Sequence, residues 1–229
     1  MQRIPEKNNF YNNVAEAEIF IENCRNNWAL KYFENNFIKY ILKKYKKFKN
    51  VSVLDLGCGP GYITIALAKA RPDWKITAVD YSQYMIEFAI KSAEISKVNI
   101  KFINSKAEDV NLESNQFDLI ISHYSFSEFE DAKKVLINIV NSVKNKAYFE
   151  MVDVLRPKSR LYMNIITKLS SFFYGEKFNQ QYIDSLKGAY SLEELKNLFN
   201  FCKLNKAEFK FSLPSRISSN IYIYIKIIK

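Results

Sequence analysis

The chain has 229 residues, of which 48% are hydrophobic, so one substantial core and a single structural domain with embellishments are expected. Its formal net charge of +10 permits an anionic partner, although a chain with abundant surface lysine is basic without any specific target. Three widely spaced cysteines and a single histidine exclude a disulfide framework and a protein metal site. With no apolar run of about 20 residues and no signal-peptide core, the chain is predicted to be cytoplasmic, with no membrane partner.

Residues 1–50 are predicted to form a helical cover. The first 13 are polar and rich in asparagine, and helical spacing of apolar residues begins at Val14. A second helix is predicted over Trp28 to Phe48, with an apolar stripe of Phe33, Phe37, Ile41, Tyr45 and Phe48. Its other face carries Lys39, Lys43, Lys44, Lys46, Lys47 and Lys49. These lysines favour a solvated face and leave a nucleic-acid contact open.

The stretch from Val53 to Ala70 reads V-L-D-L-G-C-G-P-G-Y-I-T-I-A-L-A-K-A, which predicts a strand, a glycine loop and a helix. Three of the chain's five glycines, Gly57, Gly59 and Gly61, fall within this loop. Glycine is needed where φ is positive or where a ligand approaches the backbone without meeting a Cβ atom. A cradle for a phosphate or a nucleoside is therefore predicted here, in preference to a plain turn.

The glycine spacing distinguishes two classes of ligand. A dinucleotide loop has the pattern G-x-G-x-x-G, which disfavours a nicotinamide dehydrogenase because the loop here is D-L-G-C-G-P-G. This motif resembles the first motif of the class I S-adenosylmethionine-dependent methyltransferases. The resemblance implies a Rossmann-like domain over residues 51–229, with S-adenosylmethionine as the cofactor. By this resemblance the cofactor-binding residues include Asp55, Gly57, Gly59 and Gly61.

A second strand is predicted from Lys75 to Val79, and Asp80 follows it. A carboxylate about 20 residues past such glycines can accept hydrogen bonds from both ribose hydroxyls of a nucleoside. The text V-D-Y-S-Q-Y-M-I resembles the second motif of the same family, which implies that Asp80 binds ribose while Tyr81 and Met85 pack on adenine. The residues alone leave Asp80 open as the N-cap of a helix over Ser82 to Ser96, and Met85 open as simple core.

A third strand is predicted near Asn99 to Ile103, followed by N-S-K-A-E-D-V-N-L. Similar methyltransferases often read G-D-A-E-D-L-P here, and their acid before Ala-Glu-Asp commonly meets the adenine amino group. This chain has Lys106 at that position. The resemblance therefore leaves adenine to the backbone of Ala107 and to Glu108, and a polar surface loop stays open as the alternative.

A fourth strand, buried and parallel, is predicted from Phe117 to Ser122. By resemblance it brings Ser122 to the cofactor, and His123 and Tyr124 to the edge where the methyl group would be presented. His123 could act as a general base or be a hydrogen-bonded structural residue. No Asn or Asp followed by Pro-Pro-aromatic comes after this strand. That pattern marks methyltransferases that act on planar amino groups of bases and of glutamine.

The C-terminal third is predicted to complete the sheet and to add a lid. A helix near 131–143 leads to a fifth strand over Ala147 to Asp153, in which Glu150 interrupts an apolar run and needs a partner. Residues 156–190 have their own helical pattern, and inserts at this place commonly form a substrate lid in the family. A capping box at Ser191 opens the last helix, and two strands near 207–213 and 221–228 close the sheet.

Together these elements predict an α/β fold whose Rossmann-like seven-stranded sheet is parallel except for its last strand, with helices on both faces. The predicted function is methyl transfer from S-adenosylmethionine to a small or medium-sized acceptor. The candidate acceptor contacts are Tyr11, Trp28, Arg156 and Tyr162. Two alternatives stay open: RNA or protein as the acceptor, bound by the basic second helix, and a non-catalytic subunit that binds the cofactor or a partner.

Overall fold

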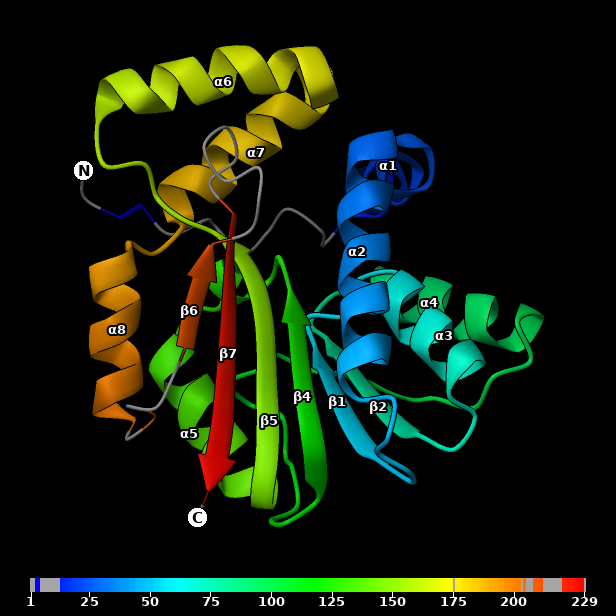
Figure 1. The fold of residues 1–229 in the computed structure, drawn as a ribbon. Helices are drawn as coiled ribbons and strands as arrows, with labels where there is room; N and C mark the ends of the chain where they lie inside the picture. The colour runs from blue at the N-terminus through cyan, green and yellow to red at the C-terminus, as the bar shows by residue number, and fades with distance from the viewer. Residues whose placement is uncertain are drawn as a thin grey trace.

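The computed structural model describes residues 3–4, 13–174, 176–202, 204, 208–211 and 220–228. In these residues a seven-stranded sheet has the order β3-β2-β1-β4-β5-β7-β6 (Figure 1). The strands are β1 (Ser52–Leu56), β2 (Lys75–Asp80), β3 (Lys101–Asn104), β4 (Phe117–His123), β5 (Val143–Val154), β6 (Glu208–Phe211) and β7 (Asn220–Ile228). Strands β1 to β5 pair in parallel, whereas β7 runs antiparallel to both of its neighbours. The predicted fold class is confirmed.

Helices cover both faces of this sheet. They are α1 (Val14–Asn26), α2 (Trp28–Lys44), α3 (Tyr62–Ala70), α4 (Gln83–Ile95), α5 (Ala132–Ser142), α6 (Arg160–Tyr174), α7 (Glu176–Gly188) and α8 (Leu192–Phe201), with a short 3-10 helix η1 (Phe126–Glu128). One core joins α5 and α8 to one face, and a second joins α2 and α3 to the other. Because both faces are covered, β1, β2 and β4 are nearly continuous buried runs.

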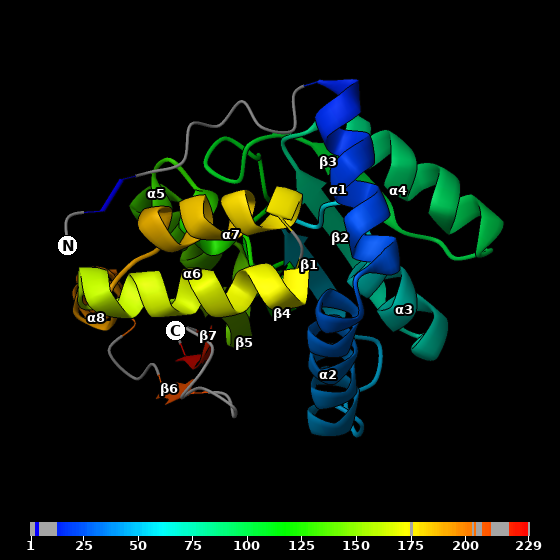
Figure 2. The ribbon, with the colours of Figure 1, turned by 90° about the horizontal axis from the view of Figure 1, so that it is seen from above.

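The predicted insert forms two helices that lie across the carboxyl ends of the central strands. Met163 and Ile166 of α6 pack against Leu186 of α7 and Ala189 just after it, together with Val154 at the end of β5. Seen from above, α6 and α7 lie side by side over one part of the sheet edge, and α1 lies beyond the other part (Figure 2). The cavity described below therefore has helical walls on two sides.

Helix α2 is held to the sheet by the acid that interrupts β5. Glu150 is buried, accepts hydrogen bonds from the hydroxyls of Tyr40 and Tyr45, and forms an ion pair with Lys44 Nζ at 2.7 Å. The Lys44 ammonium also lies 3.3 Å from the centroid of the Tyr224 ring. The prediction that Lys44 belongs to the solvated basic face of this helix is therefore wrong, because the buried carboxylate draws it inward.

No helix within the described residues has both the length and the apolar character that are needed to cross a bilayer.

Candidate cofactor and acceptor site

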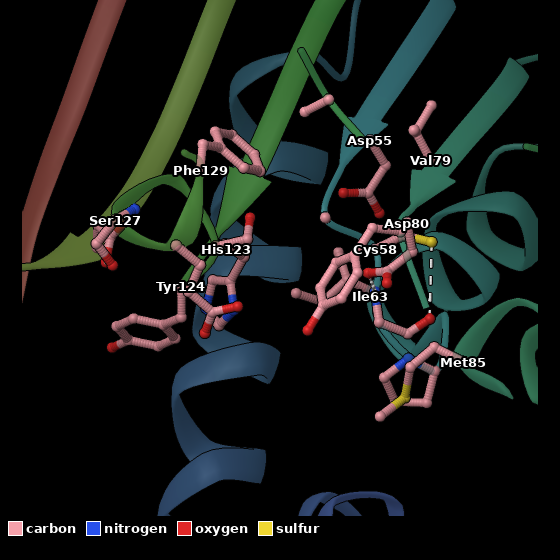
Figure 3. A pocket seen from close by; sticks show the side chains of 18 of the residues that line it. Asp55, Cys58, Ile63, Val79, Asp80, Met85, His123, Tyr124, Ser127 and Phe129 are labelled. Atoms are coloured by element: carbon pink, nitrogen blue, oxygen red, sulfur yellow. Dashed lines mark hydrogen bonds between the residues drawn. The ribbon is translucent and has the colours of Figure 1, made fainter. Parts of the chain in front are cut away.

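A cavity opens at the carboxyl ends of β1, β2, β4 and β5, where the parallel strands bring their following loops to one edge (Figure 3). The glycine loop and the end of β2 form one side of it. Residues of α1, α2 and α7 form the other. In open parallel sheets this edge is the usual place for a ligand. The predicted site residues that line it are Asp55, Gly57, Gly59, Asp80, Tyr81, Met85, Ala107, Glu108, His123 and Tyr124.

The glycine loop takes its shape from β2. The backbone N–H groups of Gly57 and Cys58 both donate to the carbonyl of Val79, at 2.8 and 3.0 Å. Gly59 has φ +51°, and a Cβ atom there would meet only the Phe20 ring at 4.0 Å, so its backbone faces open space in the cavity. Gly61, at φ +79°, does not line the cavity; a Cβ there would lie 2.9 Å from the Cβ of Ala89. Close packing of α3 on α4 therefore explains the third glycine.

Asp80 links the loop to the second strand. Its Oδ2 accepts from the Gly59 N–H at 2.8 Å, and its Oδ1 accepts from the Ser82 N–H at 2.9 Å. The N-cap of α4 is Ser82, whose hydroxyl accepts from the Met85 N–H, so the capping alternative for Asp80 does not apply. Burial raises the pKa of Asp80 to about 6. This carboxylate is held at the cavity wall by backbone donors on two sides.

Asp55 lies deeper in the wall. It is buried, and its Oδ2 accepts from the Thr64 hydroxyl at 2.5 Å. Burial raises its pKa to about 7; the Thr64 hydrogen bond lowers it and the charge of Asp80 raises it further. The two acids therefore stand close enough for each ionisation to oppose the other.

The wall beyond Asp80 comes from the loop after β3. Lys106 lines the cavity but pairs with Glu130 at 2.8 Å. Glu108 is buried, and its Oε1 accepts from the Asp131 N–H at 3.1 Å. Met85 lines the cavity and also belongs to the hydrophobic core, because it packs on Ala17 and Ile21 of α1.

His123 and Tyr124 close the end of β4. The His123 ring lies 5.0 Å from the Phe37 ring and 4.4 Å from the Tyr124 ring, measured between centroids. Its Nε2 is buried without a hydrogen-bond partner in the part of the chain that is described. Burial lowers the pKa of His123 to about 3, so the imidazole is neutral near pH 7 and a weak base. Ser122 points elsewhere: its hydroxyl is fully buried 2.9 Å from the Ser125 hydroxyl, outside the cavity wall.

Of the residues predicted to contact the acceptor, the three that the structure describes do not line the cavity. Trp28 is 62% exposed on the outside of α2. Arg156 is buried, where it donates to the Ala189 carbonyl at 3.0 Å and pairs with Glu194 at 2.6 Å, joining α7 to α8. Tyr162 packs among the residues that join α6 and α7. Tyr11 lies outside the described residues.

Other side chains line the cavity on the side away from the glycine loop, where the acceptor contacts were predicted. They are Leu30, Phe33 and Glu34 of α2, Tyr182 and Ser185 of α7, and Asp153 and Val154 at the end of β5. Phe33 belonged to the predicted apolar stripe of its helix, so its helical spacing was an available signal. Glu34 and the residues of α7 had none, because their place depends on how distant helices pack.

The sheet order, the glycine loop and the acid after β2 together define the architecture of a class I methyltransferase. The sequence model of a family described as "Methyltransferase domain" matches residues 47–201. The chain belongs to this family of methyltransferase domains.

Individual relatives give the same picture. The chain is 32% identical over 130 residues to Release factor glutamine methyltransferase of Streptococcus pneumoniae, which covers 51% of the chain and 46% of that relative. It is 25% identical over 203 residues to Ubiquinone biosynthesis O-methyltransferase of Rickettsia bellii, covering 84% of the chain and 82% of the relative. The chain thus spans about half the length of the first of these.

Solved structures of methyltransferases share the fold. Plantazolicin methyltransferase BpumL in complex with SAH has a TM-score of 0.73 at 18% identity, covering 96% of this chain and 93% of that one. A SAM-dependent methyltransferase of Aquifex aeolicus has a TM-score of 0.64 at 18% identity, with 83% and 89% covered.

Proposed function

We propose that this protein transfers the methyl group of S-adenosylmethionine to a small or medium-sized acceptor. The observation that carries the proposal is the pairing of Asp80 with the open Gly59 backbone at the cavity wall. The hydroxyls of a nucleoside ribose need a fixed hydrogen-bond acceptor. The amino-acid end of the cofactor needs backbone without Cβ atoms in its way. Family membership and the fold neighbours support the same cofactor. When bound, it supplies a methyl group activated on a sulfonium.

The residues of the cofactor side fit these roles. Asp80 would accept from the ribose hydroxyls with the lone pairs that its two backbone donors leave free. Tyr81, Met85, Ala107 and Glu108 line the wall next to it and would enclose the adenine. Lys106 is tied to Glu130, so adenine recognition would depend on the backbone near Ala107.

The acceptor side would work mainly by positioning. Phe33, Tyr124 and Tyr182 line it and would exclude water from the approach to the methyl group. We infer that residues 156–190 act as the lid of this chamber. A buried His123 of low pKa is neutral near pH 7 and would orient an acceptor by hydrogen bonding, whereas a strong base is needed only for a protonated acceptor.

The acceptor that we propose is of a different class from the glutamine for which one relative is named. Release factor glutamine methyltransferase is named for glutamine, but this chain has Ser122-His123-Tyr124-Ser125 where the Pro-Pro-aromatic pattern would follow β4. A small-molecule acceptor agrees better with a relative named for ubiquinone biosynthesis that is covered over most of its length. The cytoplasmic location stays a prediction, supported by three free cysteines.

A second candidate is an RNA acceptor, favoured by five lysines exposed along α2 and the turn after it: Lys39, Lys43, Lys46, Lys47 and Lys49. RNA binding would weaken steeply with rising salt. A non-catalytic role would leave cofactor binding intact without methyl transfer to any acceptor.

Calorimetric titration with S-adenosylmethionine and, separately, with NAD tests the proposal. We expect the wild type to bind only the first, and Asp80→Ala to bind it at least about tenfold more weakly. Asp73→Ala is the matched control, because Asp73 is an acid at the opposite end of β2, paired with Arg71 on the surface. Wild-type protein that binds neither ligand would contradict the proposed function.

A further inference from the structure

The cavity is acidic although the chain is basic. Six carboxyl side chains line it, and Lys106 is the single lysine or arginine among its described lining residues. The acids are Glu34, Asp55, Asp80, Glu108, Glu128 and Asp153. In a chain of net charge +10 this concentration is local, and it favours ligands that carry positive charge.

Most of these acids already have structural duties. Asp55 accepts from Thr64, and Asp80 accepts from the backbone of the glycine loop. Glu108 accepts from the Asp131 N–H, and Asp153 accepts from both the backbone and the hydroxyl of Ser127. These carboxylates accept hydrogen bonds that fix the loops around the cavity, so they have a structural role in the ligand-free protein.

Glu34 is different. It lies on α2 and lines both this cavity and an adjoining groove formed by residues of α1, α2, α3 and α4. Within the described residues, no hydrogen bond or ion pair holds its carboxylate. Lys31, one turn earlier, and Arg25 both line the adjoining groove without pairing with it.

The surroundings of Glu34 make an unpaired charge costly. Apolar side chains, among them Phe20, Leu30 and Ile63, line the cavity together with Glu34. Burial raises the pKa of Glu34 to about 7, and Lys31 lowers it by less. A carboxylate kept half-buried without a partner is a frequent mark of a functional site.

We propose that the Glu34 carboxylate recognises a protonated amine of a ligand in this cavity. This inference rests on the proposed function, and it restricts the ligands of the cavity to those that carry a protonated amine near Glu34. Two sources share this chemistry: the ammonium of the amino-acid end of S-adenosylmethionine, and an amino group on the methyl acceptor. In either case Glu34 gains the partner that the protein does not supply, and anionic acceptors are disfavoured.

Three probes separate the two sources when titrated into wild type, Glu34→Gln and Glu22→Gln. S-adenosylhomocysteine carries the ammonium, and 5′-methylthioadenosine lacks the whole amino-acid end. The third probe is phenethylamine, added to protein saturated with S-adenosylhomocysteine and compared with neutral 2-phenylethanol. Glu22→Gln is the matched control, since Glu22 is exposed on α1 and lines only the adjoining groove.

If Glu34 binds the ammonium of the cofactor, Glu34→Gln should bind S-adenosylhomocysteine roughly 10- to 100-fold more weakly than the wild type. It should bind 5′-methylthioadenosine as tightly as the wild type does. If Glu34 binds an amino group of the methyl acceptor, Glu34→Gln should bind both nucleosides as the wild type does. The wild type should then prefer phenethylamine over 2-phenylethanol, and Glu34→Gln should lose this preference. Both results support the proposal, provided that Glu22→Gln behaves as wild type.

The proposal is overturned if Glu34→Gln and wild type bind all of these probes equally. Folding should not obscure this result, because replacing an unpaired half-buried carboxylate by a neutral amide removes a destabilising charge. A thermal melt of the ligand-free variant at or above the wild-type temperature checks that point. If the wild type binds no nucleoside probe, the proposed function fails, and phenethylamine is then compared with 2-phenylethanol on the ligand-free protein to decide the role of Glu34.

Discussion

The two sides of the cavity are built in different ways. On the cofactor side, one loop is fixed by hydrogen bonds to the adjacent strand, with Gly57, Gly59 and Asp80 within a short stretch of chain. On the acceptor side, Phe33 and Tyr182 come from helices far apart in the sequence. The first side is defined by local backbone geometry and the second by helix packing. The acceptor side can therefore change without disturbing the cofactor side.

Substituting the first glycine should have the largest effect. A Cβ on Gly57, at φ +72°, would collide with the Cβ and Oγ of Ser125, whose hydroxyl donates to the Leu56 carbonyl. Gly57→Ala should lower the free energy of unfolding by about 3 kcal/mol through strain and overpacking. Urea denaturation monitored by circular dichroism measures this.

The matched control is Gly59→Ala, which has a positive φ but open space around the new methyl group. Its stability cost should be only about 1 kcal/mol. Equal losses in the two variants would show that the contact with Ser125 is not what requires glycine in this loop.

Loosening α2 should affect the acceptor side alone. Glu150→Ala leaves Lys44 and the hydroxyls of Tyr40 and Tyr45 without their shared acceptor, and should cost about 2 kcal/mol of unfolding free energy. Because α2 carries Phe33 and Glu34 and the glycine loop does not contact Glu150, affinity for 5′-methylthioadenosine, the part of the cofactor that Glu34 would not touch, should stay within about threefold of wild type. Denaturation and calorimetry measure the two quantities.

Lys146→Ala serves as the control for Glu150→Ala, since this residue of the same strand is exposed. If Glu150→Ala weakened cofactor binding as strongly as it weakened folding, the two sides of the cavity would not be independent.

The cofactor side was largely predictable from the sequence because its signals are contiguous. The glycines, the acid after β2 and the order of elements all follow from short motifs and periodicity. Ser122 was expected at the cofactor but does not line the cavity, because side chains alternate along a strand and Ser122 and His123 lie on opposite faces of β4. Arg156 was predicted to contact the acceptor because sequence does not reveal that Glu194 and the carbonyl of Ala189, just after α7, hold it.

The acceptor side was not predictable for a physical reason. Whether an acid such as Glu150 or Glu34 finds a partner depends on the rotation of α2 against the sheet, which no local pattern determines. Helix α2 and its C-cap Tyr45 supply three partners to Glu150, whereas Glu34 has none among the residues that the structure describes. The half-buried carboxylate of Glu34, without a partner among the described residues, is visible only once the helices are packed.

Truncating the aromatic wall should act on the acceptor with a smaller effect. Phe33→Ala removes a ring that lies 6.3 Å from the Tyr124 ring between centroids and opens the cavity to water. We expect KM for the acceptor found by labelled methyl transfer to rise about tenfold. Affinity for S-adenosylmethionine should hardly change. Tyr32→Ala, at a 52% exposed position on the same helix, should leave both quantities at the wild-type level.

The smallest expected effect is a dependence of ligand-free stability on pH. Burial raises the pKa values of Asp55 and Glu34 to about 7 and those of Asp80 and Asp153 to about 6, above the ordinary values for carboxyl groups. The folded state then binds more protons than the unfolded state from about pH 4 to pH 7, so stability falls as pH rises through this window. His123, whose pKa is lowered, opposes this trend, but mainly below its unfolded value of about 6.5.

Between pH 6 and pH 8 the ligand-free protein should therefore lose on the order of 1 kcal/mol of unfolding free energy. Asp55→Asn should flatten the profile, since it removes the group with the highest pKa on the cofactor side. Asp118→Asn provides the comparison, because this acid lies at the opposite end of β4 and pairs with Lys144. Denaturation at each pH measures the slope. A stability that rises towards pH 8 would mean that these acids are ionised without cost in the folded state, so that their hydrogen bonds to the loops outweigh the cost of burying their charge.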